Sequence, residues 1–461
     1  MHNTSKRALS LLLFVIAFLV GVVILILSFA ANANTWATFS ANRHLYNKGT
    51  IMSAGTVYDA DNKILAKTEN SNRIYNEDAT VRAATLHAVG DTEGCISTGV
   101  HSIFQSELTG YSLMNGVYYL KQNCVGNDIT LTLKSDVCAT AYSALNGQKG
   151  TVGVYNYKEG NIVCMVSSPS YDPENKPDEE TINSKEYDGV YMNRFLSGLY
   201  TPGSTFKIIT SAAALQNLPD IYSQTFSCNG KYNVTGSDRG VICSGVHGTQ
   251  NFESALNHSC NSAFAKIAIE VGKTNMQKTV EEIGLTSTLE VDRVELSKGK
   301  FDLSGAVDID IGWAGIGQYT TQINPCMMLC IVGAIANNGE AVKPYFVKQI
   351  VNYSGVTTYS NSKETVSQIH ISPELAQSLK TLLRSNVKNY YGDWKFPGLT
   401  MCGKTGTAEV QGKKDTALFT GFSEDENFPY AIIVIVEDCG PYGATTAIPI
   451  ANKVLQKLKE N

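Results

Sequence analysis

The sequence predicts an α+β fold in which an antiparallel sheet is flanked by helices. Helical segments and strand pairs joined by short turns are mixed along the chain, and the regular strand–helix–strand rhythm of a parallel sheet is missing. The 461 residues exceed one small domain. We therefore divide the chain into a tail (1–7), a transmembrane anchor (8–31), a small N-terminal module (32–140) and a larger domain (141–461).

The charge balance excludes one class of partner. The chain has 37 basic and 42 acidic residues, which gives a net charge of −5. Blocks of Lys and Arg interleaved with aromatic residues, which are typical of proteins that bind DNA or RNA, do not occur in it. We therefore expect no nucleic-acid partner.

The first element is a long apolar run without charge. Lys6 and Arg7 precede it, and the next charged residue is Arg43. Such a run can cross a bilayer as a helix. A cleaved secretory signal ending at Ala31-Asn32-Ala33 is the alternative, but the run exceeds a normal signal core. We predict a single-pass anchor in the cell membrane, with the tail cytoplasmic by the positive-inside rule and the remaining chain on the extracytoplasmic face.

The module from 32 to 140 has a mixed composition. Its first part alternates like short strands around a turn at Asp59-Ala60-Asp61-Asn62. The stretch from Gly90 to Asn127 is rich in Gly, Asn and Ser. These features predict a loop-rich unit without a large core.

The larger domain alternates between strands and helices of ordinary length. A strand and then a helix are expected around the start of this domain. A hairpin with a Lys158-Glu159-Gly160-Asn161 turn follows them. The predicted elements are strand and helix at 128–147, the hairpin at 150–173, helices at 204–216, 251–271 and 324–337, a strand pair at 417–438 and a last helix at 447–461.

Eleven cysteines leave at least one thiol unpaired within the chain. We predict a disulfide between Cys228 and Cys243, because the turn-rich sequence between them is typical of a hairpin whose ends meet. Free thiols are one alternative, and a zinc site with His247 is another that lacks a CxxC or HxxxH pair. None of the seven histidines has a ligand or catalytic spacing. The cysteines expected to be structural thiols are Cys164, Cys260, Cys326, Cys330 and Cys402.

The stretch TPGSTFKIIT places Ser204 and Lys207 at the start of an apolar helix. A helix that begins at Ser204 puts both side chains on one face. A lysine kept partly neutral by burial can take the proton of a serine, and the helix N-terminus favours developing negative charge. By itself the pattern also fits a capping serine beside a surface lysine.

Two further motifs complete a signature. Ser259-Cys260-Asn261 lies in an amphipathic helical region, and Lys404-Thr405-Gly406-Thr407 lies on a strand. S-x-x-K, S-x-N and K-T-G in this order are typical of penicillin-binding proteins and serine β-lactamases. Over nearly its whole length the sequence resembles a class B penicillin-binding protein, a membrane-anchored D,D-transpeptidase of peptidoglycan synthesis. The matching stretches include SSPSYDPE, NRFLSGLYTPGSTFKI, SCNSAFAKIAIEVG and GQYTTQINPCMMLCIVGAIANNGEAVKPY.

The resemblance implies a fold and catalytic roles. The fold would be that of the penicillin-binding-protein and serine β-lactamase transpeptidase domain. Ser204 would be the acylated nucleophile and Lys207 its base. Ser259 would relay a proton toward the leaving amine, while Asn261 would bond the substrate backbone and help to hold Lys207.

The resemblance also implies a substrate-binding strand. Lys404 would supply positive potential near the substrate carboxylate, and Thr405 and Thr407 would line the strand on which the peptide docks. The backbone N–H groups of Ser204 and Thr407 would form the oxyanion hole. We expect Gly406 to be small because a side chain there would block pairing of the substrate with the strand edge.

The implied reaction is cross-linking of D-Ala-D-Ala stem peptides through an acyl-enzyme, which penicillin and other β-lactams would trap. No metal or organic cofactor is expected. A D,D-carboxypeptidase or a β-lactamase shares the motifs, but the anchor and the module favour the synthetic enzyme, and no glutamate between the second and third motifs has the E-x-x-x-N pattern.

Two functions of another class are a β-lactam-sensing receptor and an inactive scaffold. A receptor should carry a signalling domain, and the motifs of this chain are intact. Nothing before residue 140 resembles a glycosyltransferase. We therefore expect a polytopic glycosyltransferase partner in the membrane.

Overall fold

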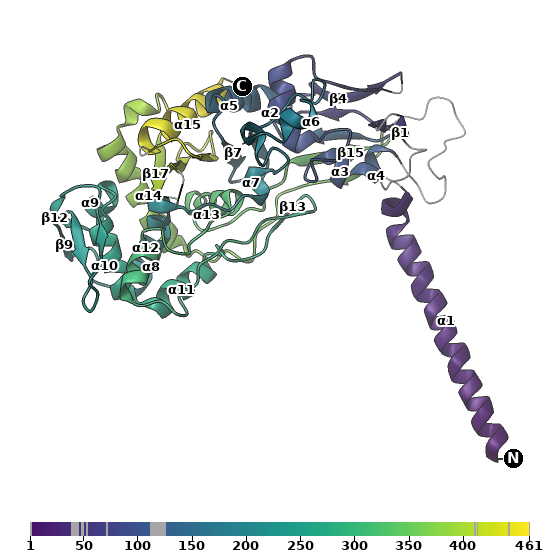
Figure 1. Cartoon of the computed structure of the whole chain (residues 1–461), viewed down its shortest axis with the longest axis horizontal. Coiled ribbons are helices and arrows are strands. Elements are labelled where there is room, and N and C mark those ends of the chain that lie inside the picture. Colours follow the sequence, from purple (N-terminus) through teal and green to yellow (C-terminus); the bar gives the residue numbers. More distant parts are fainter. Residues whose placement is uncertain are drawn as a thin grey trace.

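The described part of the chain forms two large sheets with helices packed around them, and four small two-stranded sheets (Figure 1). Strands of the first sheet run antiparallel throughout in the order β17-β18-β19-β7-β8, and the second has the order β16-β15-β6-β3-β4-β5. This α+β architecture confirms the predicted fold class. The computed structural model describes residues 2–37, 46–47, 50–51, 54–70, 72–110, 126–409, 412, 414–440 and 443–460.

The five-stranded sheet is the centre of the larger domain. Every residue of β18 is buried, because α13 and α15 both pack against β18 and β19 and helices thus cover both faces of the sheet. At one edge, β17 is paired only with β18 within the described residues. The bounds are β7 (Gly150–Asn156), β8 (Ile162–Ser168), β17 (Met401–Ala408), β18 (Thr416–Ser423), β19 (Tyr430–Val436), α13 (Pro325–Ala336) and α15 (Gly443–Lys459).

The six-stranded sheet joins segments that are far apart in the sequence. Its strands β3 to β6 come from the N-terminal half, and β15 pairs with β6 from more than 200 residues later. Buried residues of this sheet and of the five-stranded sheet belong to one continuous core. The expectation of a module without a large core is therefore wrong. The bounds are β3 (Val57–Tyr58), β4 (Ile64–Glu69), β5 (Asn72–Tyr75), β6 (Asp128–Leu131), β15 (Val347–Val351) and β16 (Thr357–Ser360).

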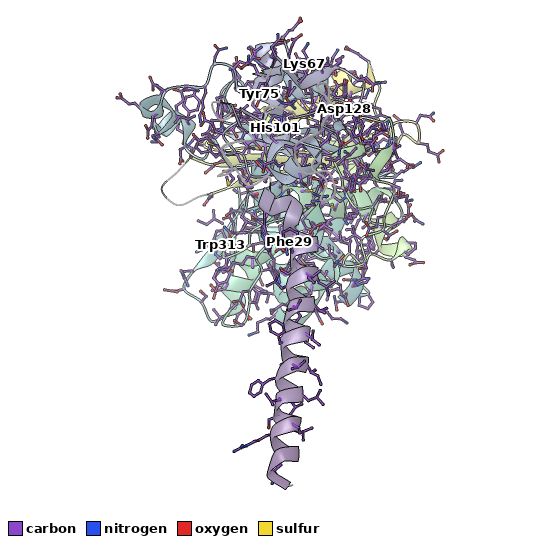
Figure 2. The ribbon with its side chains drawn as sticks, turned by 90° about the vertical axis from the view of Figure 1, so that its right-hand side faces the viewer. Phe29, Lys67, Tyr75, His101, Asp128 and Trp313 are labelled. Atoms are coloured by element: carbon purple, nitrogen blue, oxygen red, sulfur yellow. The ribbon has the colours of Figure 1, made fainter. Side chains whose placement is uncertain are left out.

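The N-terminal helix α1 (His2–Ala37) projects away from the rest of the molecule (Figures 1 and 2). Its segment Lys6–Asn32 is long and apolar enough to cross a membrane, and none of that window is buried against other parts of the chain. Large apolar side chains such as Phe14 and Phe18 are exposed along it. A core helix would bury these side chains, so the helix has the properties of an anchor.

Two predicted helices differ in detail from the sequence expectation. The segment predicted to begin as an α-helix at Ser204 starts with the 3₁₀ turn η3 (Gly203–Phe206), and α8 (Lys207–Asn217) follows. The expected helix at 251–271 is two helices, because Ser259 has a φ of 54°. The helices around this point are α9 (Phe252–Asn257), α10 (Asn261–Val271), α11 (Lys273–Glu282), α12 (Asp308–Gly315), α14 (Pro373–Asn386) and the π turn η4 (Val387–Tyr391).

A small double hairpin lies beside α10. Strand β10 pairs with β11 inside the loop that joins β9 to β12, so the two pairs are nested. This arrangement returns Cys243 to the neighbourhood of Cys228, as the hairpin prediction required. The bounds are β9 (Thr225–Cys228), β10 (Lys231–Asn233), β11 (Gly240–Ile242) and β12 (Gly248–Asn251).

Of the remaining described elements, α2 (Ala79–Val89) and α5 (Ser135–Leu145) pack against each other and against β8, and the others are short. The others are β1 (Tyr46–Asn47), β2 (Thr50–Ile51), α3 (Val100–Ile103), α4 (Gln105–Leu108), α6 (Glu179–Ile182), η2 (Lys185–Tyr187), α7 (Arg194–Ser197), β13 (Glu290–Val291), β14 (Val294–Glu295) and η5 (Asp393–Lys395).

Candidate active site

Ser204 lies on the tight turn η3, which packs directly against strand β17. The turn depends on Gly203, whose φ is 51° and whose added Cβ would lie 2.2 Å from the carbonyl oxygen of Thr407. Any larger residue at Gly203 would thus push the turn off the strand. The glycine before Ser204 therefore sets the distance between the serine and the K-T-G strand.

Lys207 is in contact with the serine and is fully buried. A hydrogen bond of 2.8 Å joins its Nζ to Ser204 Oγ, as the i, i+3 spacing predicted. The same Nζ donates to the carbonyl oxygen of Ser259 at 2.9 Å and to Asn261 Oδ1 at 2.6 Å. Burial first, and then the charge of nearby Lys404, lower the pKa of Lys207 well below its usual value. A lysine in this environment can be neutral and can accept a proton.

Ser259 connects the two lysines of the site. Its Oγ lies 3.3 Å from Lys207 Nζ and 3.0 Å from Lys404 Nζ. The residue occupies the break between α9 and α10 in a left-handed conformation, with a φ of 54°. The prediction that Ser259 lies inside a helix is therefore wrong, and the break directs both its carbonyl and its hydroxyl at Lys207.

Lys404 is also fully buried, and it is held by a residue that the motifs do not include. Its Nζ donates to the Thr405 carbonyl oxygen at 3.0 Å and lies 3.4 Å from the hydroxyl of Tyr391. Burial lowers the pKa of Lys404 to about 7. Both protonation states of this lysine are thus accessible near neutral pH.

Tyr391 is the functional residue that sequence reasoning missed. Its hydroxyl accepts a hydrogen bond of 3.0 Å from the Thr405 N–H and lies 2.8 Å from Thr405 Oγ1. The π turn η4 at the end of α14 carries this side chain into the site. The sequence around Tyr391 contains no catalytic motif, so only the spatial contact with Lys404 and Thr405 identifies it.

The edge of β17 opposite β18 faces the turn that carries the nucleophile. A residue of an antiparallel strand directs its N–H and C=O to the same side, and alternate residues share that side. The Thr405 N–H donates to the Tyr391 hydroxyl, and the Thr407 carbonyl oxygen faces Gly203. The backbone N–H and C=O groups of residues 405 and 407 therefore point away from β18. Both threonines are half-buried at this edge.

The structure adds a packing reason for Gly406 to the expected one, which stays a prediction. A Cβ at this position would lie 2.7 Å from the Pro202 carbonyl oxygen and 3.0 Å from Thr205 Cγ2. The missing side chain therefore makes room for the turn that carries Ser204, and it is this packing that an alanine would disturb first.

The ten cysteines in the described residues are all free thiols, so the predicted Cys228–Cys243 disulfide is wrong. Cys124 lies outside the described residues. Four of the cysteines expected to be structural are buried in the core: Cys164, Cys326, Cys330 and Cys402.

Cys260 and His247 have a different environment from the one predicted. Together with Cys228 and Cys243 they place their Sγ and imidazole N atoms within 4.8 Å of one another. His247, for which no ligand spacing was predicted, thus lies in space beside three thiols. The spacing Cys243-x-x-x-His247 was the signal that could have identified it.

Comparison with known proteins assigns the family. The family described as penicillin binding protein transpeptidase domain matches residues 150–456. The chain belongs to this family. Among curated relatives, the peptidoglycan D,D-transpeptidase PbpA of Mycolicibacterium smegmatis is 26% identical over 72% of this chain and 72% of its own length. Stage V sporulation protein D of Bacillus subtilis is 27% identical over 72% of this chain and 53% of its own length.

Solved structures agree with the family assignment. Penicillin-binding protein A from M. tuberculosis, solved as a penicillin G acyl-enzyme complex, superposes with a TM-score of 0.77 at 22% identity, over 88% of this chain and 99% of that one. The fold of this chain is thus the transpeptidase fold. The relatives confirm the resemblance to class B penicillin-binding proteins, and together with α1 they indicate a membrane-anchored penicillin-binding protein.

Proposed function

We propose that this penicillin-binding protein is a peptidoglycan D,D-transpeptidase that cross-links stem peptides through an acyl-enzyme on Ser204. The observation that carries the proposal is the chain of contacts from Ser204 Oγ to Lys207 Nζ, from there to Ser259 Oγ, and from Ser259 Oγ to Lys404 Nζ. It joins the nucleophile to two buried amines and to a hydroxyl between them. Such a chain can move a proton in both directions.

Acylation begins when Ser204 Oγ attacks the carbonyl carbon of the penultimate D-Ala. Neutral Lys207, 2.8 Å away, accepts the hydroxyl proton as the new C–O bond forms. The backbone N–H groups of Ser204 and Thr407 stabilise the negative oxygen of the tetrahedral intermediate. Ser259 passes a proton to the nitrogen of the departing D-Ala, and Lys207 replaces that proton.

Deacylation repeats these steps in reverse with a new amine. An amine from a neighbouring stem peptide attacks the ester carbonyl and gives up a proton to Ser259, which passes one on to Lys207. Lys207 then protonates Ser204 Oγ as the ester C–O bond breaks. Asn261 Oδ1, at 2.6 Å from Lys207 Nζ, keeps the lysine side chain aligned with Ser204. When a β-lactam acylates Ser204, its ring opens but the leaving nitrogen stays tethered to the acyl group. The remaining fragment excludes the acceptor amine, so the acyl-enzyme is trapped.

The edge of β17 would bind the peptide. Thr405 and Thr407 point away from β18, where an extended substrate can add as a further strand. Lys404 is buried behind this edge, so its positive charge would attract the substrate carboxylate without touching it. A second route would run from Lys404 through the Tyr391 hydroxyl to Thr405. This refines the expected role of Lys404.

The orientation and the larger assembly also belong to the proposal. Lys6 and Arg7 precede the apolar part of α1, which favours residues 1–7 in the cytoplasm and residues 32–461 outside. We keep an N-terminal module (32–140) and a transpeptidase domain (141–461) as functional units. Structurally they are joined, because β15 and β16 complete the sheet of the module and the boundary falls inside α5. A polytopic glycosyltransferase would then supply the glycan strands.

Labelling with a fluorescent penicillin tests the nucleophile. Trypsin cuts after Arg194 and Lys207, so the label should be recovered on the peptide FLSGLYTPGSTFK, with fragment masses that place it on Ser204 and not on Ser197. The variant Ser204→Ala should remain unlabelled, while Ser197→Ala should label normally. Recovery of the adduct on Ser259 would contradict the proposal.

Turnover separates the synthetic enzyme from its hydrolytic relatives. The transpeptidase should hold the penicilloyl ester for many minutes and should join two stem peptides when lipid-linked glycan strands and a glycosyltransferase are supplied. Release of D-Ala without cross-linked product would identify a D,D-carboxypeptidase. Sustained hydrolysis of a chromogenic cephalosporin would identify a β-lactamase.

A further inference from the structure

Three thiols and one imidazole meet beside the S-x-N motif. Cys228 ends β9, Cys243 follows β11, His247 precedes β12, and Cys260 caps α10. Their candidate ligand atoms all lie within 4.8 Å of one another, and only His247 is partly exposed. The double hairpin and the active-site helix thus each contribute to one cluster.

The distances in the cluster fit the edges of a tetrahedron around one metal ion. Cys243 Sγ and Cys260 Sγ are 3.8 Å apart, and the Nδ1 of His247 lies 3.5 Å from both Cys228 Sγ and Cys243 Sγ. A tetrahedral zinc ion, with bonds of about 2.3 Å to sulfur and about 2.0 Å to nitrogen, gives S–S edges of about 3.8 Å and S–N edges of about 3.5 Å.

Backbone donors around the sulfur atoms favour thiolates. The Asn261 N–H donates to Cys243 Sγ at 3.3 Å, and the Ala263 N–H donates to Cys260 Sγ at 3.4 Å. The thiolate is the form of cysteine that binds metals.

We propose that Cys228, Cys243, His247 and Cys260 bind one Zn²⁺ ion in a closed structural site. Four protein ligands of the Cys₃His type leave no open coordination position, so the ion would hold the fold and take no part in acyl transfer. The inference goes beyond the proposed function and does not depend on it.

The ion would position the catalytic residues through Cys260. This cysteine lies between Ser259 and Asn261, which both contact Lys207 Nζ. Asn261 is held a second time, because its Nδ2 donates to the Ile242 carbonyl oxygen at 3.0 Å and its N–H donates to Cys243 Sγ. A metal that fixes Cys243 and Cys260 relative to each other therefore fixes the left-handed turn at Ser259.

Metal content is the direct test. We expect the full chain, purified in detergent without chelators, to contain one zinc per molecule by elemental mass spectrometry. Replacement by Co²⁺ should give the intense visible absorption of a tetrahedral site and a sulfur-to-cobalt charge-transfer band. Cys243→Ser should lose both signals. Cys330→Ala and His258→Ala are matched controls: a buried cysteine outside the cluster, and a histidine stacked on His247 at 5.4 Å.

Thiol alkylation of the wild-type chain provides a test that does not depend on a variant folding. A chelator should expose Cys228, Cys243 and Cys260 to alkylation, while Cys95, which is partly exposed, should react with or without it. Chelation should also slow penicillin acylation by roughly ten- to a hundredfold, as expected for a displaced catalytic group, and Zn²⁺ should restore the rate.

Three results would overturn the proposal. One is a chain without metal that acylates at the full rate. Another is a disulfide between two of the three cysteines in a non-reduced digest of the active protein. The last is a Cys243→Ser variant that keeps the zinc content and the cobalt spectrum of the wild type.

Discussion

Replacing Tyr391 by phenylalanine removes one oxygen atom from the active site and leaves the ring in place. That oxygen accepts a hydrogen bond from the Thr405 N–H, contacts Thr405 Oγ1 and lies 3.4 Å from Lys404 Nζ. The substitution therefore breaks the contact between the substrate-binding edge and the buried lysine, while the core packing of the aromatic ring persists.

The size of the effect follows from the groups left behind. A buried donor that loses its acceptor costs about 1–3 kcal/mol. Thr405 is half-buried, so water can replace part of the contact, and we expect about 1–2 kcal/mol. If this loss falls on the transition state of acylation, the rate constant should drop roughly 5- to 30-fold.

Stopped-flow acylation with a fluorescent penicillin measures this constant. Tyr390→Phe is the matched control, because Tyr390 is the neighbouring tyrosine, its ring contacts that of Tyr391 at 5.7 Å, and its side chain is 53% exposed. The control should acylate like the wild type. A wild-type rate for Tyr391→Phe, or an equal loss in Tyr390→Phe, would refute the assigned role of the hydroxyl.

Three further predictions concern the lysines, the strand packing and the anchor. Because burial lowers the pKa of Lys404 to about 7, acylation should decline as the pH rises through that value and the lysine loses its charge; Lys404→Gln should be slower and show no such decline in a pH–rate profile. Gly406→Ala should slow acylation while retaining the fold by circular dichroism, since its Cβ would lie 2.7 Å from the Pro202 carbonyl oxygen; an unchanged rate would contradict this close packing. A chain lacking residues 1–37 should label with penicillin but leave the membrane fraction on centrifugation, whereas the full chain should sediment with membranes.

The sequence predicted those parts of the fold that have a local signal. Strand β19 is a continuous apolar run, β18 precedes it by a short connection, and α13 is an apolar helix with a capping Asn324. The pairing of β6 with β15 was not predicted, because it joins segments more than 200 residues apart and leaves no periodicity in either strand. The core of the N-terminal region was missed for the same reason.

The site residues that could be predicted are those that belong to a sequence motif. Ser204, Lys207, Ser259 and Lys404 carry motifs, and the structure places them in one chain of contacts. The break at Ser259 was hidden, because the apolar pattern of α9 continues into α10 and a left-handed serine leaves no trace in that pattern. Tertiary contact was needed to reveal both this break and the tyrosine on η4.

The cysteine cluster shows why spacing alone could not decide between a disulfide and a metal site. The hairpin prediction concerned two thiols, and two adjacent thiols favour a disulfide. The fold adds His247 from the same loop and Cys260 from the end of the turn that carries Ser259, and these come together only in space. Three sulfur atoms and an imidazole surround one point. A disulfide would join only two of the sulfur atoms and would leave the third thiol and the imidazole unused. A four-ligand metal site uses all four groups, and this difference favours zinc.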